Sequence, residues 1–396
     1  LEAPVHQNAN ILFNRAFTCG HFVLVSVGTQ LVGIDTLGTP DQPGARLLWR
    51  SNFSYFGRQN IPPRIVGGNF RRRPMPLNQI GEQVGTIGPV TRDHVALLSG
   101  HKLTVLDSLS GKPLWTREGV ASGTDLFGDD ELLLAVPADA GPAAVYSALD
   151  GTVLGHRALP PSRTRLETVG RNVITWGARE GRSVLALRDA WTSKDLWSRP
   201  FEEGAQVTLI ELDEAAVLEP SGKFTVVSLN DGASSFEGPA EIDAKVRQIH
   251  VIRSREHYIL IANHVTNNAV SGWQQVTPQA IAVQGWVSGY ARATGKHWTT
   301  FIDRQGIDLH QPQNLPVLTF MCHFTTPRKN AAALDNHFGL TCLDKRTGRI
   351  IFDERDLDEH LYFVEYVTDI EQKHLDLRLF GSVLRLTFTD KPIPDE

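Results

Sequence analysis

Residues Leu103–Arg117, with the sequence LTVLDSLSGKPLWTR, contain the repeating unit that decides the fold. An apolar run typical of a buried strand ends in Asp107, a short turn closes on Gly111, and a second strand follows with Trp115. The Asp107 side chain can accept hydrogen bonds from the amides of the turn, and Gly111 suits a left-handed backbone conformation. The unit therefore predicts a β-hairpin whose second strand offers Trp115 to a neighbouring sheet.

The same unit recurs along the chain with variations. Asp344, Gly348 and Phe352 keep the spacing, and Asp189, Ser193 and Trp197 keep it with serine in the glycine position. Further variants occur at Ser228–Gly232–Phe236, at Gly295 with Trp298, around Gly151 without an aromatic residue, and from Asp35 to Trp49 with a longer turn. The turn positions 111, 151, 193 and 232 lie 40, 42 and 39 residues apart, which is typical of propeller blades.

The repeat predicts an all-β chain folded as one β-propeller of four-stranded antiparallel blades. Eight blades are expected, with seven as the alternative, and Trp115 and Trp197 should be largely buried at equivalent positions of the outer strands. The predicted domain is 1–396, with blades at about 18–53, 85–120, 123–160, 165–201, 204–239, 246–302, 308–356 and 361–390.

The last predicted blade, 361–390, has three strand-like runs and no turn-and-aromatic unit after them. Residues 9–17 should complete it, with the segment around Ile11–Phe13 beside the C-terminal strands. Such closure removes two open sheet edges, which would otherwise favour aggregation.

Three long insertions interrupt the rhythm, at 54–84, 264–279 and 325–336. With the strands of a blade labelled A to D, strand alternation puts A–B and C–D turns at one face and B–C turns at the other. The first insertion connects two blades and the other two are B–C connections, so all three should rise from the face opposite the Asp–Gly turns. Loops on a rigid scaffold often bind partners, and we selected Arg71, Arg72, Arg73, Trp273, Arg328 and Lys329 as candidate contacts.

Bulk composition restricts the classes of function. The chain has 396 residues, of which 41% are hydrophobic and 21% charged, as in ordinary globular proteins, and its formal net charge of −5 gives no reason to expect nucleic-acid binding. No stretch approaches the roughly 18 apolar residues of a membrane helix. The chain contains no targeting segment and starts LEAPVHQ, consistent with a mature form or an excised domain.

The three cysteines, Cys19, Cys322 and Cys342, are too few for a disulfide scaffold. Cys322 and Cys342 fall on adjacent predicted strands and either pair or remain two buried thiols. The sequence does not decide between these alternatives.

The repeats LTVLDSLSGKPLWTR, VLALRDAWTSKDLWSR and LTCLDKRTGRIIF resemble those of the pyrroloquinoline-quinone-type β-propellers. That superfamily contains quinoprotein dehydrogenases and a non-enzymatic outer-membrane assembly lipoprotein of Gram-negative bacteria, and the chain looks closer to the second type. The resemblance implies a periplasmic, cell-surface or secreted protein. The enzymatic branch stacks its quinone against a disulfide of neighbouring cysteines, and this chain has no adjacent Cys pair and no CxxCH haem site.

Other catalytic signatures are absent from the sequence, which has no GxxxxGK, HExxH or GxSxG motif. Asp335, Asn336 and His337 form a polar trio in an expected loop, where such residues are ordinary turn formers. Cys322 and His323 are adjacent in an expected strand, so they should point to opposite faces and not share a metal ion. We predict no cofactor and no metal site.

Three functions remain open. The favoured one is a non-catalytic scaffold that binds a protein, or a glycan, through loops on one face. The alternatives are a quinone-dependent dehydrogenase or other enzyme with a site in the central funnel, and a passive structural module of a larger surface protein. No nucleic-acid partner is expected, and a small-molecule ligand remains unknown.

Overall fold

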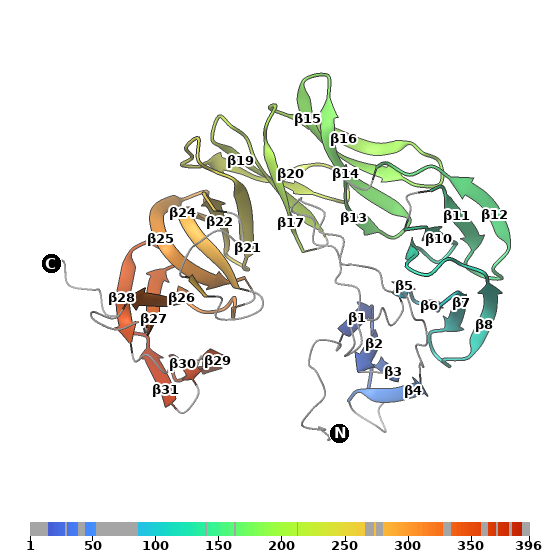
Figure 1. The fold of residues 1–396 in the computed structure, drawn as a ribbon, viewed down its shortest axis with the longest axis horizontal. Coiled ribbons are helices and arrows are strands. Elements are labelled where there is room, and N and C mark those ends of the chain that lie inside the picture. Colours follow the sequence, from blue (N-terminus) through green and yellow to red (C-terminus); the bar gives the residue numbers. More distant parts are fainter. Residues whose placement is uncertain are drawn as a thin grey trace. The chain divides into compact units, whose positions relative to one another are not determined.

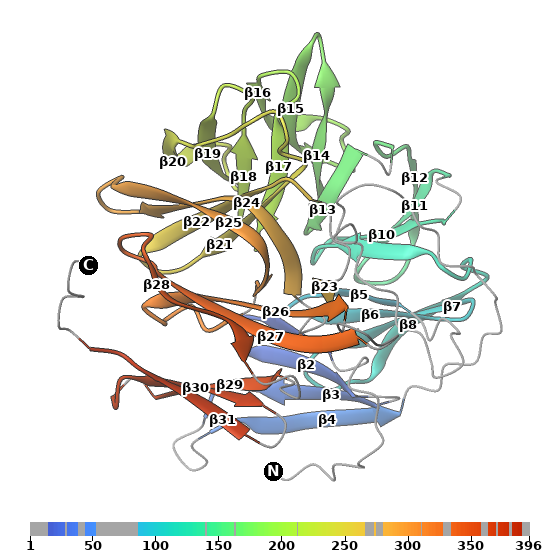
Figure 2. The same cartoon turned by 60° about the vertical axis from the view of Figure 1, so that its left-hand side comes forward.

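Figure 1 shows the chain in a computed structural model, and Figure 2 shows it turned by 60°. The described residues contain no α-helix and are organised as antiparallel β-sheets, which confirms the predicted all-β class. The structure describes residues 15–27, 30–38, 44–52, 86–138, 141–161, 164–211, 213–265, 273–274, 280–309, 311–327, 334–357, 363–369, 371–379 and 382–389.

The described contacts divide into two compact units, one of residues 1–179 and 184–200 and one of residues 180–183 and 201–396. Four meandering sheets precede residue 202, each with its strands in sequence order, as in a propeller blade. Their strands are β1 (Arg15–Cys19), β2 (Phe22–Val27), β3 (Gln30–Asp35), β4 (Arg46–Asn52); β5 (Thr86–Val90), β6 (His94–Ser99), β7 (Lys102–Asp107), β8 (Pro113–Glu118); β9 (Asp125–Gly128), β10 (Leu132–Val136), β11 (Ala143–Ser147), β12 (Val153–Arg157); and β13 (Arg165–Val169), β14 (Asn172–Arg179), β15 (Arg182–Asp189), β16 (Asp195–Phe201).

The second unit continues the same pattern with a four-stranded sheet, an eight-stranded sheet and a three-stranded sheet. The eight-stranded sheet joins two meanders through a single residue pair between β25 and β26. The strands are β17 (Gln206–Ile210), β18 (Glu214–Leu218), β19 (Lys223–Ser228), β20 (Ser234–Pro239); β21 (Gln248–Arg253), β22 (His257–Asn263), β23 (Trp273–Gln274), β24 (Ala280–Ala291), β25 (His297–Asp308), β26 (Val317–Pro327), β27 (Leu334–Asp344), β28 (Ile350–Leu357); and β29 (Phe363–Asp369), β30 (His374–Leu379), β31 (Ser382–Thr387).

One backbone hydrogen bond marks the same place in every meander. The amide after the third strand donates to a carbonyl in the turn between the first and second strands, which ties these two turns together at one end of the sheet. The donor and acceptor residues are Thr36 and His21, Ser108 and Asp93, Ala148 and Glu131, Ala190 and Arg171, Leu229 and Asp213, Arg292 and Glu256, Lys345 and Pro316, and Phe388 and Lys373.

The predicted turn chemistry is confirmed at the opening motif. The Ser110 amide donates to Asp107 Oδ1 at 2.7 Å, and the Gly111 amide donates to the Asp107 carbonyl at 2.8 Å. A hydrogen bond from the Ser110 side chain also helps to lower the pKa of Asp107. Gly111 has φ of 66°, and Ser193 accepts the same left-handed conformation with φ of 59°. The turn, rather than the side chain at its last position, therefore sets the backbone here.

The aromatic residue of one sheet packs on the turn of the next. Trp49 donates from Nε1 to the Ser108 carbonyl at 2.7 Å, and Trp115 donates to the Ala148 carbonyl at the same distance. A Cβ added to Gly111 would lie 2.5 Å from the Trp49 ring, and one added to Gly151 would lie 2.6 Å from the Trp115 ring. Only glycine leaves room for these rings, so the turn glycine serves packing as well as backbone conformation.

An arginine two residues after the aromatic position adds a second clamp. Arg117 donates from Nε and Nη2 to the Gly151 carbonyl at 2.9 and 2.7 Å. Arg157 donates from Nε to the Trp191 carbonyl at 2.8 Å, and its guanidinium carbon lies 3.8 Å from the centre of the Trp191 ring. The segments LWTR and LWSR both place an arginine two residues after the tryptophan, so the sequence carried a signal of this clamp.

The prediction that Trp115 and Trp197 are largely buried was wrong in degree. Both occupy the third position of their outer strands, β8 and β16, and both are half-buried, whereas Trp49 is 8% exposed. Trp49 also lies on the last strand of its sheet, β4, so the position of the strand alone does not determine how far the ring is buried.

The assignment of residues 9–17 to the last blade needs correction. Residues 15–17 belong to β1, which pairs with β2 in the first sheet, with Arg15 opposite Ser26 and Phe17 opposite Leu24. Residues 1–14, which include Ile11–Phe13, lie outside the described residues. The C-terminal sheet has the three strands β29, β30 and β31, and both the closure and the count of eight blades stay predictions.

Candidate interaction surface

The structure describes one of the six predicted contact residues. Trp273 lies in β23, where its backbone is described. Arg71, Arg72 and Arg73, as well as Arg328 and Lys329, lie outside the described residues. The residues at both ends of the insertions 264–279 and 325–336 are described, so their connections to the sheets are visible. Residues 54–84 lie outside the described residues.

The two insertions of the second unit arise from unusually long hairpins. β24 and β25 have 12 residues each, and β26 and β27 have 11 each, whereas the other described strands have at most 8. β26 and β27 stay paired from Val317 opposite Asp344 to Pro327 opposite Leu334. Residues 325–327 and 334–336 of the expected loop 325–336 are thus strand, which corrects their assignment to an irregular insertion. The same pairing places Asp335, Asn336 and His337 in β27 and not in a loop.

Each insertion connects the second and third strands of its meander, β22 to β24 and β26 to β27. Within each meander, the turns linked by the recurrent backbone bond lie at the other end of the second strand, because successive strands are antiparallel. β23 lies within the first insertion and pairs with β26 just before the second insertion, with Trp273 opposite Phe324 and Gln274 opposite His323. We call β23 and β24–β27 the hairpin platform.

Asn263 fixes the point at which the first insertion leaves the sheet. Its side chain is fully buried, and Nδ2 donates to the Ala282 carbonyl at 2.7 Å while Oδ1 accepts from the Gln284 amide at 2.9 Å. The His264 amide donates to the Gln284 carbonyl at 2.8 Å, across a register shift of β24 between Val283 and Gly285. A buried amide with both ends paired holds a bulge in one geometry.

A second buried amide supports the base of β26. Gln311 Oε1 accepts from the Thr319 amide at 2.8 Å and from its hydroxyl at 3.0 Å. The Thr319 hydroxyl lies 3.2 Å from the Tyr366 hydroxyl, and burial raises the pKa of Tyr366. These bonds hold the platform on a rigid, neutral polar base.

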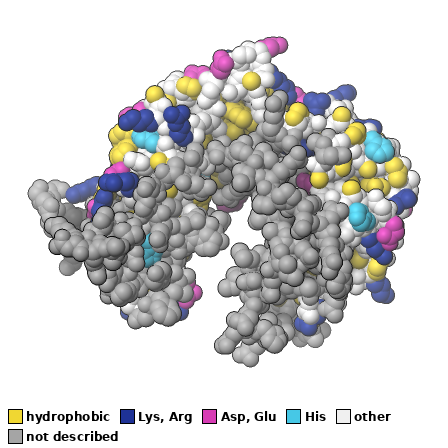
Figure 3. Space-filling model, viewed as in Figure 1, with side chains coloured by type: hydrophobic (Ala, Val, Ile, Leu, Met, Phe, Trp, Pro, Cys, Tyr) yellow, Lys and Arg dark blue, Asp and Glu magenta, His cyan; other side chains and the backbone are white. Residues whose placement is uncertain are grey.

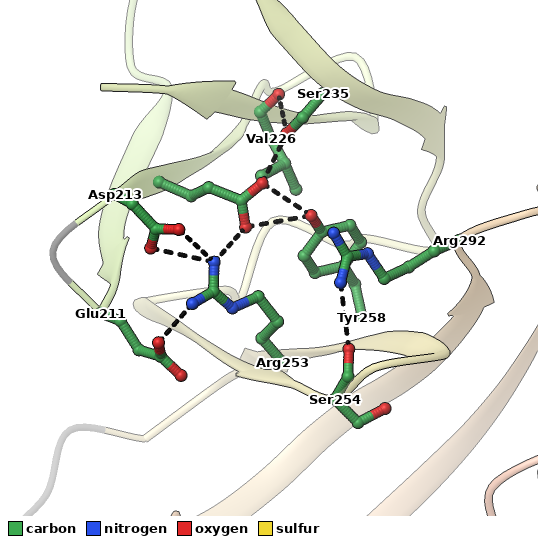
Figure 4. Close-up of polar contacts among 9 residues, drawn as sticks. Glu211, Asp213, Val226, Ser235, Arg253, Ser254, Tyr258 and Arg292 are labelled. Atoms are coloured by element: carbon green, nitrogen blue, oxygen red, sulfur yellow. Dashed lines mark hydrogen bonds and ion pairs between the residues drawn. The ribbon is translucent and has the colours of Figure 1, made fainter. Parts of the chain in front are cut away.

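A cluster of carboxylates around Arg253 in the second unit holds neighbouring strands together (Figure 4). Arg253 donates from Nη1 to Asp213 at 2.8 Å and to Glu214 at 3.0 Å, and from Nη2 to Glu211. Tyr258 donates from its hydroxyl to Glu214 at 2.8 Å. The hydrogen bond to Asp213 contributes most to raising the pKa of Arg253. The guanidinium is thus held by carboxylates, and the cluster clasps β21 to the turn between β17 and β18.

Cys322 and Cys342 are unpaired, buried thiols in the described structure, which decides between the two alternatives left open by the sequence, and Cys19 is a half-buried thiol. Cys322 lies opposite Gly339, and Cys342 lies opposite Thr319, so the two are three positions apart along the paired strands and on opposite faces. Burial raises the pKa of Cys322 to about 11 and that of Cys342 to about 12. Neither thiol is a thiolate at neutral pH, as a nucleophile or metal ligand would need to be.

The histidines and acids do not assemble into a metal centre within the part of the chain that is described. No group of three or more His, Cys, Asp or Glu side chains is placed there to hold an ion. Burial also lowers the pKa of His323, whose neighbour Cys322 points to the other face of β26.

Exposed apolar side chains of the first unit lie on the turns and outer strands. Figure 3 shows hydrophobic side chains dispersed among charged ones on the described part of the face that it presents. Leu109 is 57% exposed, Leu114 47% and Leu149 81%. Isolated exposed leucines are ordinary on protein surfaces, so this pattern does not by itself define an interface.

Comparison with known proteins identifies no family. No protein-family model matches the chain, and no curated protein matches it. Similar solved structures include BamB from Moraxella catarrhalis, with 13% identity, a TM-score of 0.34 and coverage of 94% of this chain and 95% of that one. The C-terminal WD40 domain of Sif2 has 8% identity, a TM-score of 0.37 and coverage of 93% of both chains. Hsv2 of Kluyveromyces lactis has 10% identity, a TM-score of 0.36 and coverage of 74% of this chain and 98% of that one.

These scores are too low to carry an argument about function, and the fold description rests on the sheets themselves. In the part of the chain that the structure describes, no helix is long and apolar enough to cross a membrane.

Proposed function

We propose that the chain is a non-catalytic β-propeller scaffold that binds a protein partner through the hairpin platform. The observation that carries the proposal is the pairing of β23, within the insertion 264–279, with His323 and Phe324 of β26, the strand that leads into the insertion 325–336. The other described strands keep to 8 residues or fewer, so the platform is where the chain departs from its own repeat. A departure built on a rigid scaffold is the usual location of a binding site.

The base of the platform is built for rigidity. Asn263 and Gln311 are both buried with paired side chains, and Phe320 and Phe338 are fully buried. A rigid base lowers the entropy that a binding surface loses on association. A periplasmic, cell-surface or secreted location remains part of the proposal and agrees with the resemblance to extracytoplasmic propellers.

Deletions within the two insertions test this function. Three variants, lacking residues 266–272, residues 328–333 or both, should keep the circular dichroism spectrum of the wild type. We expect each to lose capture of the partner from native-source extract, and the double variant to lose it completely. The control is Leu149→Ser, at an exposed turn of the other unit, which should capture the partner normally. Undiminished capture by the double variant would contradict the proposal.

A further inference from the structure

Four hairpins of the first unit carry a large apolar side chain at the same position of the turn. The position is the second residue after the third strand of each sheet, and we call it the apex of the turn. Leu37, Leu109 and Leu149 occupy it with exposed fractions of 57%, 57% and 81%, and the half-buried Trp191 occupies it in the fourth sheet. The equivalent turns of the second unit have Asn230, Ala293 and Arg346 at the apex. The apolar apex is therefore a property of the first unit and not of the repeat.

Hydrogen bonds between neighbouring sheets place the four turns in a row. Each donor is a side chain on the strand that leaves one turn, and each acceptor is the carbonyl of the next apex residue or of the residue before it. The donor and acceptor residues are Trp49 and Ser108 at 2.7 Å, Trp115 and Ala148 at 2.7 Å, and Arg157 and Trp191 at 2.8 Å. Successive turns are thus neighbours along the first unit, and their apolar apexes form a series that scattered exposed leucines would not form.

Basic residues accompany the apolar apexes. The segments that run from these turns through the outer strands are 36–52, 108–118, 148–157 and 190–201. They contain seven Lys or Arg and four Asp or Glu, a net charge of +3, whereas the whole chain has a net charge of −5. Lys112 and Lys194 are exposed in the second and fourth turns. The aspartates that precede three of the turns, Asp35, Asp107 and Asp189, accept hydrogen bonds from turn amides.

This combination of side chains fits an anionic lipid surface. Leucine and tryptophan enter the boundary between headgroups and acyl chains, while lysine and arginine remain among the negative headgroups. A protein interface instead gathers its apolar side chains into a core that is depleted of charge. On the described part of the face shown in Figure 3, hydrophobic side chains are dispersed among charged ones. The charge and the spacing of the apolar groups therefore favour lipid over a protein partner.

From these observations we propose that the row of turn apexes, Leu37, Leu109, Leu149 and Trp191, is a docking site for an anionic lipid surface. The site goes beyond the proposed function, because the hairpin platform belongs to the second unit. A chain with a net charge of −5 is repelled by such a surface at a distance. Binding therefore needs the apolar apexes and the neighbouring basic side chains together, and added salt weakens the electrostatic part of it.

Vesicle binding by the full chain tests this inference. The wild type should sediment with vesicles made of equal parts phosphatidylglycerol and phosphatidylcholine, and not with vesicles of phosphatidylcholine alone. Leu109→Ser/Leu149→Ser should weaken binding to the anionic vesicles about tenfold or more, because two apolar side chains no longer enter the interface. Lys112→Gln/Lys194→Gln should weaken it by a similar factor, because two charges near the headgroups are lost.

The second unit supplies the matched control. Ile350→Ser/Val383→Ser removes two apolar side chains that are 44% and 56% exposed in β28 and β31, and it should bind the anionic vesicles like the wild type. A polarity-sensitive dye on Leu149→Cys, in a Cys19→Ser background, should shift to the blue when these vesicles are added. The same dye on Ile350→Cys should not shift.

Three results would overturn the inference. The first is a folded wild type that does not bind the anionic vesicles, or binds neutral vesicles equally well. The second is equal binding by the leucine variant and its control. The third is dimerisation of the wild type that Leu109→Ser/Leu149→Ser abolishes, without vesicle binding, which would assign the row to a second copy of the chain. None of these results bears on partner capture by the hairpin platform.

Discussion

Replacing Trp49 by alanine should remove the packing between the first two sheets. The ring is 8% exposed and lies between two glycines, because a Cβ on either Gly33 or Gly111 would fall 2.5 Å from it. Its Nε1 donates to the buried carbonyl of Ser108 at 2.7 Å. No smaller side chain fills the same slot, and the glycines on both sides have no side chain with which to collapse into the space.

The expected loss of stability follows from these contacts. Removing a buried tryptophan ring costs about 3–5 kcal/mol, and leaving the Ser108 carbonyl without its donor adds about 1 kcal/mol. Trp49→Phe keeps an aromatic ring between the glycines and loses the Nε1 donor, so it should cost about 1–2 kcal/mol. The difference between the two variants separates the packing from the hydrogen bond.

Native-state hydrogen exchange gives a local readout of this loss. The Gly111 amide donates to the Asp107 carbonyl within the turn that Trp49 covers, so its free energy of opening should fall by the amounts above. Leu149→Ala, at an 81% exposed side chain, is the control and should change stability by less than about 0.5 kcal/mol. A loss below about 1 kcal/mol for Trp49→Ala, or equal losses for both Trp49 variants, would refute the packing argument.

Four further outcomes are expected. Ser193→Gly should stabilise the chain by up to about 1 kcal/mol in urea unfolding, because Ser193 holds a φ of 59° that glycine adopts without strain; a loss of stability would contradict this. Burial lowers the pKa of His94 in the folded chain, so below about pH 6.5 the unfolded chain binds a proton more readily than the folded chain does. The free energy of unfolding should therefore decrease as the pH is lowered below this value, and His94→Gln should make that decrease smaller. Cys322 and Cys342, with pKa values of about 11 and about 12, should resist iodoacetamide at pH 8 until urea unfolds the chain, and mass spectrometry that found rapid alkylation of the native protein would show the thiols to be accessible. Deleting residues 1–14, which stops short of β1, should lower the melting temperature if this segment completes the sheet of β29–β31, and an unchanged melting temperature would count against closure.

The sequence predicted the local chemistry of the repeat because that chemistry is short-range. Asp107 and Gly111 act within one turn, and their spacing alone indicates the hydrogen bonds and the left-handed residue. The sequence predicted that the aromatic residue of a hairpin packs against a neighbouring sheet. It did not identify Gly111 as the contact of Trp49, because the two residues belong to different sheets. The Arg117 clamp was missed, although its arginine recurs beside the tryptophan in LWTR and LWSR.

The candidate site was less predictable because it depends on register and strand length. Residues 325–336 have the polar composition of a loop, yet residues 325–327 and 334–336 extend the β26–β27 hairpin, where backbone pairing with a neighbouring strand outweighs local preference. The pairing of Trp273 with Phe324 joins segments about fifty residues apart, and no periodicity in the sequence indicates it. The positions of the insertions could therefore be predicted from the sequence, whereas the pairing of β23 with β26 could be found only in the structure.

Site-specific photo-crosslinking tests the central claim, that the hairpin platform receives a protein partner. A photoreactive phenylalanine is placed at position 273 in the platform and, as the control, at position 149 on an exposed turn of the other unit. After irradiation in native-source extract, the account predicts one dominant crosslinked protein from position 273, suppressed by excess unlabelled wild type, and none of that product from position 149. The same product from both positions, or none from position 273 in a folded chain, would contradict it.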